Sequence, residues 1–217
     1  MTSSISNICA AIGRRITPVL AWAITGVRPH WLGCKPDTRQ RIYFANHSSH
    51  GDFILIWSCL PTRLQHLTRP VAGADYWLKS PMRKFIGCGV FNALLVERQP
   101  KGVSRSWLAQ MTAALQSGSS LIVFPEGTRN STDEVLLPFK GGIHQLALAC
   151  PDVELVPVWI ENINRVLPKG DFLPVPLLCS VTFGAPVHVA ADEPRKAFLR
   201  RAENALAALA PETGKTA

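Results

Sequence analysis

A polar stretch at residues 46–52 contains the residue types whose spacing favours acid–base chemistry. His47 precedes Asp52 by five positions, and Asp52 lies where the first turn of a helix is expected. The helix dipole stabilises a carboxylate there, and the carboxylate can reach back as the acid of a capping box does. The spacing predicts an imidazole held in one tautomer by a carboxylate, with its other nitrogen free to accept a proton. Such a general base contributes roughly 10²–10⁴-fold to a rate.

The flanking elements indicate how this stretch is displayed. Residues 41–45 are β-branched and aromatic, as in a short strand, and residues 53–60 are apolar on every side, as in a buried helix. The polar stretch is therefore expected on a strand-to-helix turn, where backbone N–H groups point outward. We expect Ser48 or Ser49 to cap the helix. A first-turn acid beside an unrelated loop histidine explains the spacing equally well.

A second motif, Phe-Pro-Glu-Gly-Thr-Arg, occupies residues 124–129 and follows an apolar, strand-like run. A turn that contains glycine exposes backbone N–H groups, and Arg129 can hold a phosphate through two parallel hydrogen bonds. Thr128 offers a hydroxyl, and Glu126 could orient Arg129 or a substrate hydroxyl. A polar turn with an internal Glu–Arg ion pair is the alternative interpretation.

Arg98 follows another strand-like run, at residues 91–96. The carboxyl ends of parallel strands open onto one crevice at one edge of a sheet. We therefore expect His47, Arg98 and Arg129, each of which comes after a predicted strand, to meet at that edge.

Strand-like and helical segments alternate along the 217 residues, which predicts a single α/β domain with a largely parallel mixed sheet flanked by helices. Further strands are expected at residues 69–72, 154–160 (broken by Pro157) and 177–183, and further helices at 102–116, 143–150 and 194–209. We divide the chain into an N-terminal amphipathic segment (1–39), a core (40–191) and a C-terminal helix with a tail (192–217).

The N-terminal segment is apolar and contains Trp22 and Trp31, but Arg14 and Arg15 interrupt it. Its uninterrupted apolar part, residues 16–27, falls short of the ~20 residues that a spanning helix needs. Basic residues beside an apolar face with tryptophans predict a segment that lies in the membrane interface. An ordinary N-terminal helix packed on the domain is the alternative.

The net charge of +8 and the pI near 9.5 predict an anionic partner. Anionic lipid, a phosphorylated substrate and nucleic acid all qualify. The sequence has no zinc-finger spacing, RNA-binding aromatic motif or long Lys/Arg block, so nucleic acid is the least favoured of the three. The six cysteines form no Cys-x-x-Cys pair, which favours free thiols in a reducing compartment.

Taken together, these motifs give the chain a clear resemblance to the glycerolipid acyltransferase family, which includes bacterial 1-acyl-glycerol-3-phosphate acyltransferases. Asn46, His47, Ser49 and Asp52 match its first block, Asn-His-x-Ser-x-x-Asp, and residues 124–129 match its third block in full. Residues 95–98 match the second block, with Glu97 where the family usually has Asp, and residues 155–158 match the fourth. The residues after the third block, up to Lys140 and Gly142, also resemble the family.

The resemblance implies transfer of a fatty acyl group from an acyl thioester, acyl-CoA or acyl carrier protein, to the free hydroxyl of 1-acyl-glycerol-3-phosphate, giving phosphatidic acid. It implies that His47, oriented by Asp52, is the general base, and that neither a cofactor nor a metal is needed. The residues expected to contact substrate are Ser49, Arg98, Glu126, Gly127, Thr128, Arg129 and Lys140.

The expected partners are the acyl thioester donor, the lysophospholipid acceptor and an anionic membrane surface. The expected location is the cytoplasmic face of the inner membrane, as a peripheral or monotopic protein.

Three alternatives stay open. The acceptor could be glycerol-3-phosphate, a lyso-ornithine lipid or another lysophospholipid, although Arg98 and Arg129 disfavour an acceptor without phosphate. A non-catalytic protein that binds lipid surfaces would need neither His47 nor Asp52. A metal-dependent hydrolase built on His47, His50 and Asp52 is the least favoured.

Overall fold

The computed structural model describes residues 2–97, 106–161, 179–190 and 192–211. Within these residues, seven strands form one sheet in the order β1-β7-β6-β2-β5-β3-β4. The strands are β1 (Arg28–Trp31), β2 (Arg41–Ala45), β3 (Thr68–Gly73), β4 (Leu94–Val96), β5 (Ser120–Val123), β6 (Glu154–Glu161) and β7 (Ser180–Phe183). All neighbouring strands are parallel except β6 and β7. The predicted α/β domain with a largely parallel mixed sheet is confirmed.

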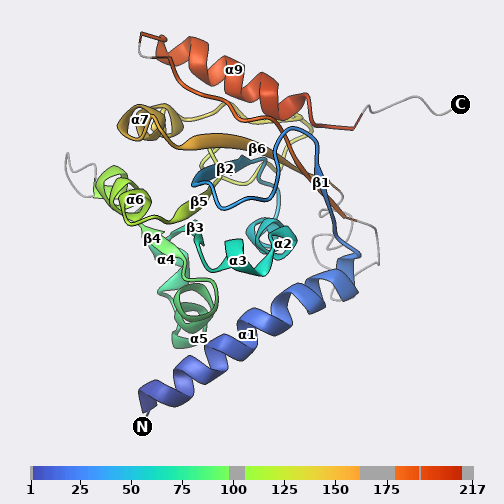
Figure 1. Cartoon of the computed structure of the whole chain (residues 1–217), viewed down its shortest axis with the longest axis vertical. Coiled ribbons are helices and arrows are strands. Elements are labelled where there is room, and N and C mark those ends of the chain that lie inside the picture. The colour runs from blue at the N-terminus through green and yellow to red at the C-terminus, as the bar shows by residue number, and fades with distance from the viewer. Residues whose placement is uncertain (1, 98–105, 162–178, 191, 212–217) are drawn as a thin grey trace, which may run out of the picture.

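Helices cover both faces of the sheet (Figure 1). One face is covered by α1 (Thr2–Thr25), α2 (Asp52–Cys59) and α3 (Thr62–Gln65), and the other by α6 (Ser106–Gln116), α7 (Gly142–Ala149) and α9 (Arg195–Ala207). Between β3 and β4 the chain forms α4 (Ala74–Trp77), α5 (Pro81–Lys84) and a π-helical turn, η1 (Phe85–Val90). These last elements lie on the same side as α1.

The central strand β2 shows why both faces need cover. All five of its residues are buried, as expected for a parallel strand in the middle of a sheet. Ile42 and Phe44 pack in the core formed with α6, α7 and α9, whereas Tyr43 and Ala45 pack in the core formed with α2. Successive side chains of a strand point to opposite faces, so one short strand contributes to both cores.

The strand β6 runs unbroken through Pro157, so the prediction of a broken strand was wrong. The carbonyl of Pro157 points toward β7, because it accepts a hydrogen bond of 2.9 Å from the N–H of Gly184. The nitrogen and the carbonyl of one strand residue point to the same side, so the nitrogen of Pro157 also faces β7. The ladder between β6 and β7 includes Val158 but not Pro157. The ladder with β2 therefore loses no hydrogen bond to the proline.

The helix α1 is longer than the sequence analysis expected. It has 24 residues, and Ser6–Thr25 is long and apolar enough, by length and composition, to cross a membrane. The sequence analysis counted only the uninterrupted apolar part, residues 16–27, because it ended the segment at Arg15. The helix continues through Arg14 and Arg15, and Arg14 donates a hydrogen bond of 2.8 Å to the carbonyl of Gly89.

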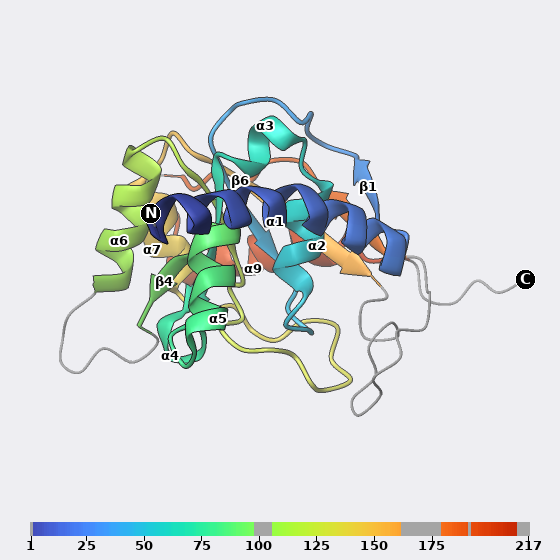
Figure 2. The same cartoon turned by 90° about the horizontal axis from the view of Figure 1, so that it is seen from below.

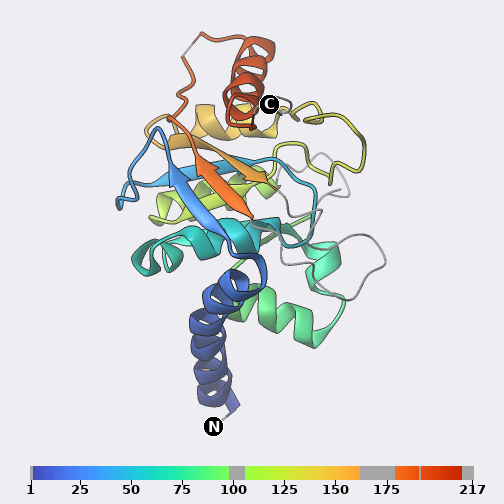
Figure 3. The same cartoon turned by 90° about the vertical axis from the view of Figure 1, so that its right-hand side faces the viewer.

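α1 lies along the outside of the molecule (Figure 2) and extends away from the sheet on that side (Figure 3). After it, β1 forms the edge of the sheet by pairing with β7. The sequence analysis did not expect the strand β1 within residues 1–39. All six cysteines are free, and Cys59, Cys150 and Cys179 are buried.

Candidate active site

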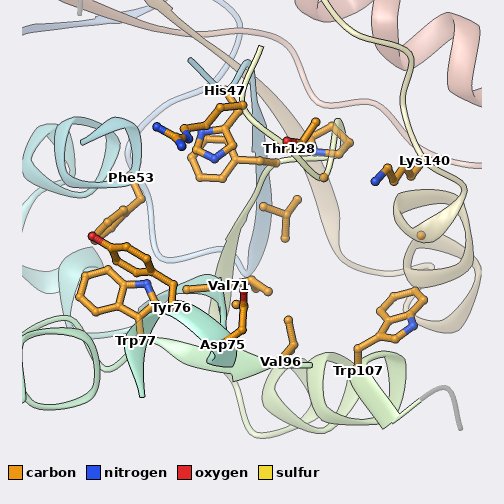
Figure 4. Close-up of a pocket in the computed structure, with 18 of the residues that line it drawn as sticks. His47, Phe53, Val71, Asp75, Tyr76, Trp77, Val96, Trp107, Thr128 and Lys140 are labelled. Atoms are coloured by element: carbon orange, nitrogen blue, oxygen red, sulfur yellow. The ribbon is translucent and has the colours of Figure 1, made fainter. Parts of the chain in front are cut away.

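A pocket of about 980 Å³ lies at the edge of the sheet where the parallel strands β2, β3, β4 and β5 end. Polar residues at one part of it come from the loops after β2 and β5, namely His47, His50, Gly127, Thr128, Arg129 and Lys140. Apolar walls come from Val71, Val96, Trp107, Met111, Val123 and Leu146. Figure 4 shows His47, Thr128 and Lys140 along one side of the cavity, with Val71, Val96 and Trp107 opposite them. The pocket thus combines an ionic region with an apolar one.

Asp52 holds the imidazole of His47 in place. Nδ1 of His47 lies 2.8 Å from Oδ2 of Asp52, and the same oxygen accepts hydrogen bonds from the N–H groups of Ser48 (2.7 Å) and Ser49 (2.9 Å). Asp52 is fully buried. A carboxylate oxygen accepts, so Nδ1 of His47 carries the proton and Nε2 is the nitrogen free to accept one. The contact expected from the spacing is present.

The start of α2 differs from the expectation. Gly51 is the N-cap residue, and no side chain caps the helix, so the prediction that Ser48 or Ser49 does so was wrong. The hydroxyl of Ser49 instead accepts a 3.2 Å hydrogen bond from the N–H of Gly51. At the start of the helix, backbone carbonyls take the place of a serine cap: the N–H of Asp52 donates to the carbonyl of Ser49 at 3.4 Å, and that of Ile54 to the carbonyl of Gly51 at 2.9 Å.

Glu126 ties two loops together. Its Oε1 accepts a 2.8 Å hydrogen bond from the N–H of His47, and its Oε2 accepts one of 3.0 Å from the N–H of Leu137. The residue is buried, and burial raises the pKa of its carboxyl, although the two N–H groups act in the opposite direction. Both oxygens therefore bind backbone amides, which differs from the contact with Arg129 or a substrate hydroxyl that the motif suggested.

Further contacts fix the backbone and the ring of His47. The side chain of Asn46 pairs with the backbone of Ile160 in both directions, at 3.0 and 2.8 Å, and so extends the ladder of β6. The N–H of Asn130 donates to the carbonyl of His47 at 2.6 Å. The ring of Phe124 stacks on the imidazole with a centroid distance of 4.2 Å. The motifs at residues 46–52 and 124–129 are thus tied together by these contacts.

The turn at Gly127 brings cations to the pocket. Gly127 has a φ of +69°, and a Cβ atom at this position would lie 2.9 Å from Nζ of Lys140. The positive φ favours glycine, and the absence of a Cβ atom lets the lysine side chain lie against the turn. Arg129 and Thr128 line the pocket beside Lys140. Two cationic side chains and a hydroxyl are a suitable environment for a phosphate group.

Arg98 lies outside the described residues, so its predicted place at this edge of the sheet stays a prediction. Glu97, the residue before it, does line the pocket. This position agrees with the rule that the carboxyl ends of parallel strands share one crevice.

His50 lies at the same pocket, and its ring stacks on Tyr76 with a centroid distance of 5.0 Å. Burial lowers the pKa of His50 below its ordinary value of 6.5, and Coulombic repulsion from Arg129, and from His47 when it carries a second proton, lowers it further. Within the described ranges, no group of three or more His, Cys, Asp or Glu side chains is arranged to hold a metal ion.

Sequence reasoning did not identify the residues that close the pocket on the side of β3 and α6. Val71, Asp75, Tyr76, Trp107 and Met111 all line it. The signal for Asp75 and Tyr76 was available, because they follow a predicted strand just as His47 does. Trp107 and Met111 were assigned to a helix, and their distance from the motifs along the chain concealed their contact with the pocket.

Comparisons with known proteins agree with this geometry. A model of the Acyltransferase family matches residues 32–161, more than half of the chain. The fold is similar to the crystal structure of the 1-acyl-sn-glycerophosphate (LPA) acyltransferase PlsC from Thermotoga maritima, with a TM-score of 0.70 and 21% identity, over 96% of this chain and 80% of that one.

Curated relatives carry one name, 1-acyl-sn-glycerol-3-phosphate acyltransferase. The Limnanthes douglasii protein is 26% identical over 182 residues, which cover 81% of this chain and 60% of the relative. The alpha form of Mus musculus is 27% identical over 76% of this chain and 59% of its own length. The Helicobacter pylori protein is 27% identical over 58% of this chain and 50% of its own length. The matched region thus spans three-fifths or less of these relatives.

Proposed function

The chain belongs to the Acyltransferase family, and we propose that it moves a fatty acyl group from an acyl thioester to the free hydroxyl of 1-acyl-glycerol-3-phosphate, giving phosphatidic acid. The observation that carries the proposal is the 2.8 Å contact between His47 and Asp52 in a pocket that also contains Arg129 and Lys140. The shared name of the curated relatives supports this acceptor.

The proposed chemistry needs no nucleophile from the protein, because the acceptor supplies a hydroxyl. Nε2 of His47 accepts the hydroxyl proton as the oxygen attacks the thioester carbonyl. The buried carboxylate of Asp52 stabilises the imidazolium that forms. The tetrahedral intermediate then collapses, the C–S bond breaks, and the imidazolium returns its proton to the leaving thiolate.

The cationic part of the pocket orients the acceptor. Arg129, Lys140 and Thr128 hold its phosphate, and each charge-assisted hydrogen bond contributes about 1.5–3 kcal/mol. Arg98 is the further phosphate ligand that the sequence predicts. With the phosphate fixed, the acceptor hydroxyl lies near Nε2 of His47, and this orientation supplies much of the rate acceleration. The apolar walls of the same pocket receive acyl chains.

The helix α1 supports attachment to a membrane. Its small residues Ala10 and Ala21 face the body of the protein and are 5% and 8% exposed. Its large apolar residues point outward, namely Ile8, Ile12, Ile16, Val19, Leu20, Trp22 and Ile24, each at least 43% exposed. A helix that packs on a soluble domain shows the reverse distribution. We propose that α1 binds an anionic membrane at the cytoplasmic face, where acyl thioesters and free thiols are both maintained.

A panel of acceptors and donors tests this function. The purified full chain is mixed with vesicles and either acyl-CoA or acyl carrier protein, and with lysophosphatidate, glycerol-3-phosphate, a lyso-ornithine lipid or lysophosphatidylcholine. Products are identified by mass spectrometry. We expect the highest kcat/KM with lysophosphatidate. A higher kcat/KM with any other acceptor, or no acylated product at all, would contradict the proposal.

A further inference from the structure

The segment formed by α4 and α5, residues 74–84, has two different sides. On its inner side, Asp75, Tyr76 and Trp77 line the pocket, and Figure 4 shows them along one wall of the cavity. Lys79 lies at the boundary of the two sides, because it is exposed and also contributes to the pocket lining. The α4–α5 segment is therefore part of the substrate site. Its outer side takes no part in the pocket.

The α4–α5 segment is held firmly on the body of the protein. The ring of Trp77 packs against Gly87, where a Cβ atom would lie 2.8 Å from Cε3 of the tryptophan. The same ring makes an edge-to-face contact with Phe53 at 5.9 Å. The guanidinium group of Arg83 lies over the ring of Tyr76, 4.5 Å from its centroid. These contacts orient the outer side in a defined direction.

The outer side exposes large apolar side chains. Leu78 is 55% exposed and Met82 is 70% exposed. Both stay exposed even though the segment itself is packed on the body of the protein through Trp77. Two exposed lysines flank them, namely Lys84 on the outer side and Lys79 at its boundary with the pocket. The acidic residue of the segment, Asp75, lines the pocket instead. Apolar side chains surrounded by cations are typical of a surface that enters the headgroup region of an anionic bilayer.

The α4–α5 segment lies on the same side of the molecule as α1. Figures 1 and 3 both place α5 and α1 on one side of the sheet. The turn η1 connects them, because α5 continues into η1 and Arg14 of α1 donates to the carbonyl of Gly89. Gly13 of α1 packs closely on Val90, because a Cβ atom at Gly13 would lie 3.0 Å from Cγ2 of Val90. One surface can therefore contact both elements.

We propose that the outer side of the α4–α5 segment is a second contact with an anionic bilayer, made by Leu78 and Met82 with Lys79 and Lys84. Contacts at α1 and at this segment together place the pocket wall at the bilayer surface. The lysophospholipid then enters the pocket directly from the membrane, without passing through water. This deepens the proposed function and rests on it for the identity of the substrate, but the contact itself is a matter of binding alone.

The test compares Met82→Asp and Leu78→Asp with Leu148→Asp. Leu148 is a matched control because it is 45% exposed on α7, which covers the opposite face of the sheet. Flotation with vesicles of phosphatidylcholine and phosphatidylglycerol measures binding. Turnover with acyl-CoA is measured for lysophosphatidate in vesicles and for a short-chain lysophosphatidate that stays monomeric in water. Thermal melting checks that each variant is folded.

We expect Met82→Asp and Leu78→Asp each to weaken vesicle binding about tenfold or more, since a membrane contact would bury the apolar side chain. Turnover of the vesicle substrate falls with binding, whereas turnover of the monomeric substrate and the behaviour of Leu148→Asp stay unchanged. Vesicle binding equal to that of the unmodified chain would overturn the inference. So would an equal loss on the monomeric substrate, which would place the effect in the pocket.

Two outcomes separate this inference from the proposed function. If no acceptor is acylated, the proposed function fails, while flotation still tests the membrane contact. If binding is normal and the loss appears only with acyl carrier protein as donor, the surface docks that acidic protein and the inference is wrong.

Discussion

At the scale of single residues, the site is built from hydrogen bonds between side chains and nearby backbone. Oδ2 of Asp52 accepts from His47 and from two consecutive N–H groups, and Glu126 fixes the backbone of His47 from the other side. The imidazole is therefore held by groups that cannot move without disturbing the loop. Such preorganisation lets a general base act without first being ordered.

Replacing Asp52 with Asn tests the positioning of the imidazole. The amide keeps the shape of the carboxylate but cannot stabilise an imidazolium, and we expect kcat to fall by about 10²-fold or more. The KM for lysophosphatidate changes little, because Asp52 is fully buried and does not line the pocket. Steady-state kinetics measure both quantities. Asp152→Asn, at an exposed site, is the control, and an Asp52→Asn enzyme with normal kcat would contradict this role.

Replacing Glu126 with Gln tests the second anchor. The amide has one acceptor oxygen, so either the N–H of His47 or that of Leu137 loses its partner. We expect a lower kcat with an unchanged KM for lysophosphatidate, because the group lost is a positioning group rather than a ligand. A rise in KM at constant kcat would instead indicate the substrate contact that the motif first suggested.

The Glu126→Gln variant also tests how the free energy of unfolding depends on pH. Burial raises the pKa of Glu126 above its ordinary value of 4.5. Between the pKa of 4.5 in the unfolded chain and the raised pKa in the folded chain, the folded chain binds more protons than the unfolded chain. The contribution of Glu126 to the free energy of unfolding therefore falls as the pH rises through this range. Gln does not titrate. In urea unfolding at a series of pH values, the stability of the unmodified chain relative to Glu126→Gln should therefore decrease from pH 4.5 upward. A relative stability that increases would contradict the assignment.

Sequence spacing was informative at this scale only where two side chains meet within one turn. The pair His47 and Asp52 could be predicted because a carboxylate at the start of a helix reaches residues just before it. The contacts of Glu126 could not, because its partners are backbone amides of two separate loops, and amides leave no mark in a sequence.

At the scale of elements, the order of strands brings the motifs together. β2, β3, β4 and β5 are parallel neighbours, so the loops that follow them meet at one edge. This could be predicted from the alternation of strands and helices. The strand β1 could not, because three of its four residues are exposed and the strand pairs only at the edge. Its place depends on β7, about 150 residues later in the chain.

The attachment of β1 is tested by Gly33→Ala. A Cβ atom at Gly33 would lie 2.2 Å from the backbone nitrogen of Ala185, and backbone cannot move aside as a flexible side chain can. We expect a loss of roughly 1–3 kcal/mol in the free energy of unfolding, as for other overpacked sites. Gly141→Ala is the control, since its nearest neighbour is the side chain of Arg195 at 3.2 Å. Equal stabilities of the two variants by urea unfolding would contradict this account.

At the scale of the whole molecule, the distribution of apolar surface divides the protein into two sides. Large apolar residues of α1 and of the α4–α5 segment are exposed on one side of the sheet, while α7 and α9 close the other. The sequence predicted a membrane segment near the N-terminus from its tryptophans and arginines. Residues 76–85 read as a basic, tryptophan-bearing surface element that suits either solvent or lipid headgroups. The sequence does not decide between the two, because which side of a short helix is exposed depends on the tertiary packing of Trp77.

Replacing Ile16 with Asp tests the role of α1. Ile16 is 47% exposed near the middle of the helix, so a charge there does not disturb the core. We expect vesicle binding to weaken about tenfold or more, since the apolar side chain can no longer enter the bilayer. Flotation measures the bound fraction. If Ile16→Asp binds vesicles as Leu148→Asp does, α1 is not a membrane contact.

The most direct test of the whole account is the turnover of lysophosphatidate by His47→Ala, with His66→Ala, an exposed histidine on the loop after α3, as the matched control. Formation of phosphatidate is followed by mass spectrometry with enzymes that melt at the same temperature. We predict that His47→Ala loses about 10²–10⁴-fold in kcat, whereas His66→Ala retains full activity. Full activity in folded His47→Ala would show that the imidazole held by Asp52 is not the base, and the account would be wrong.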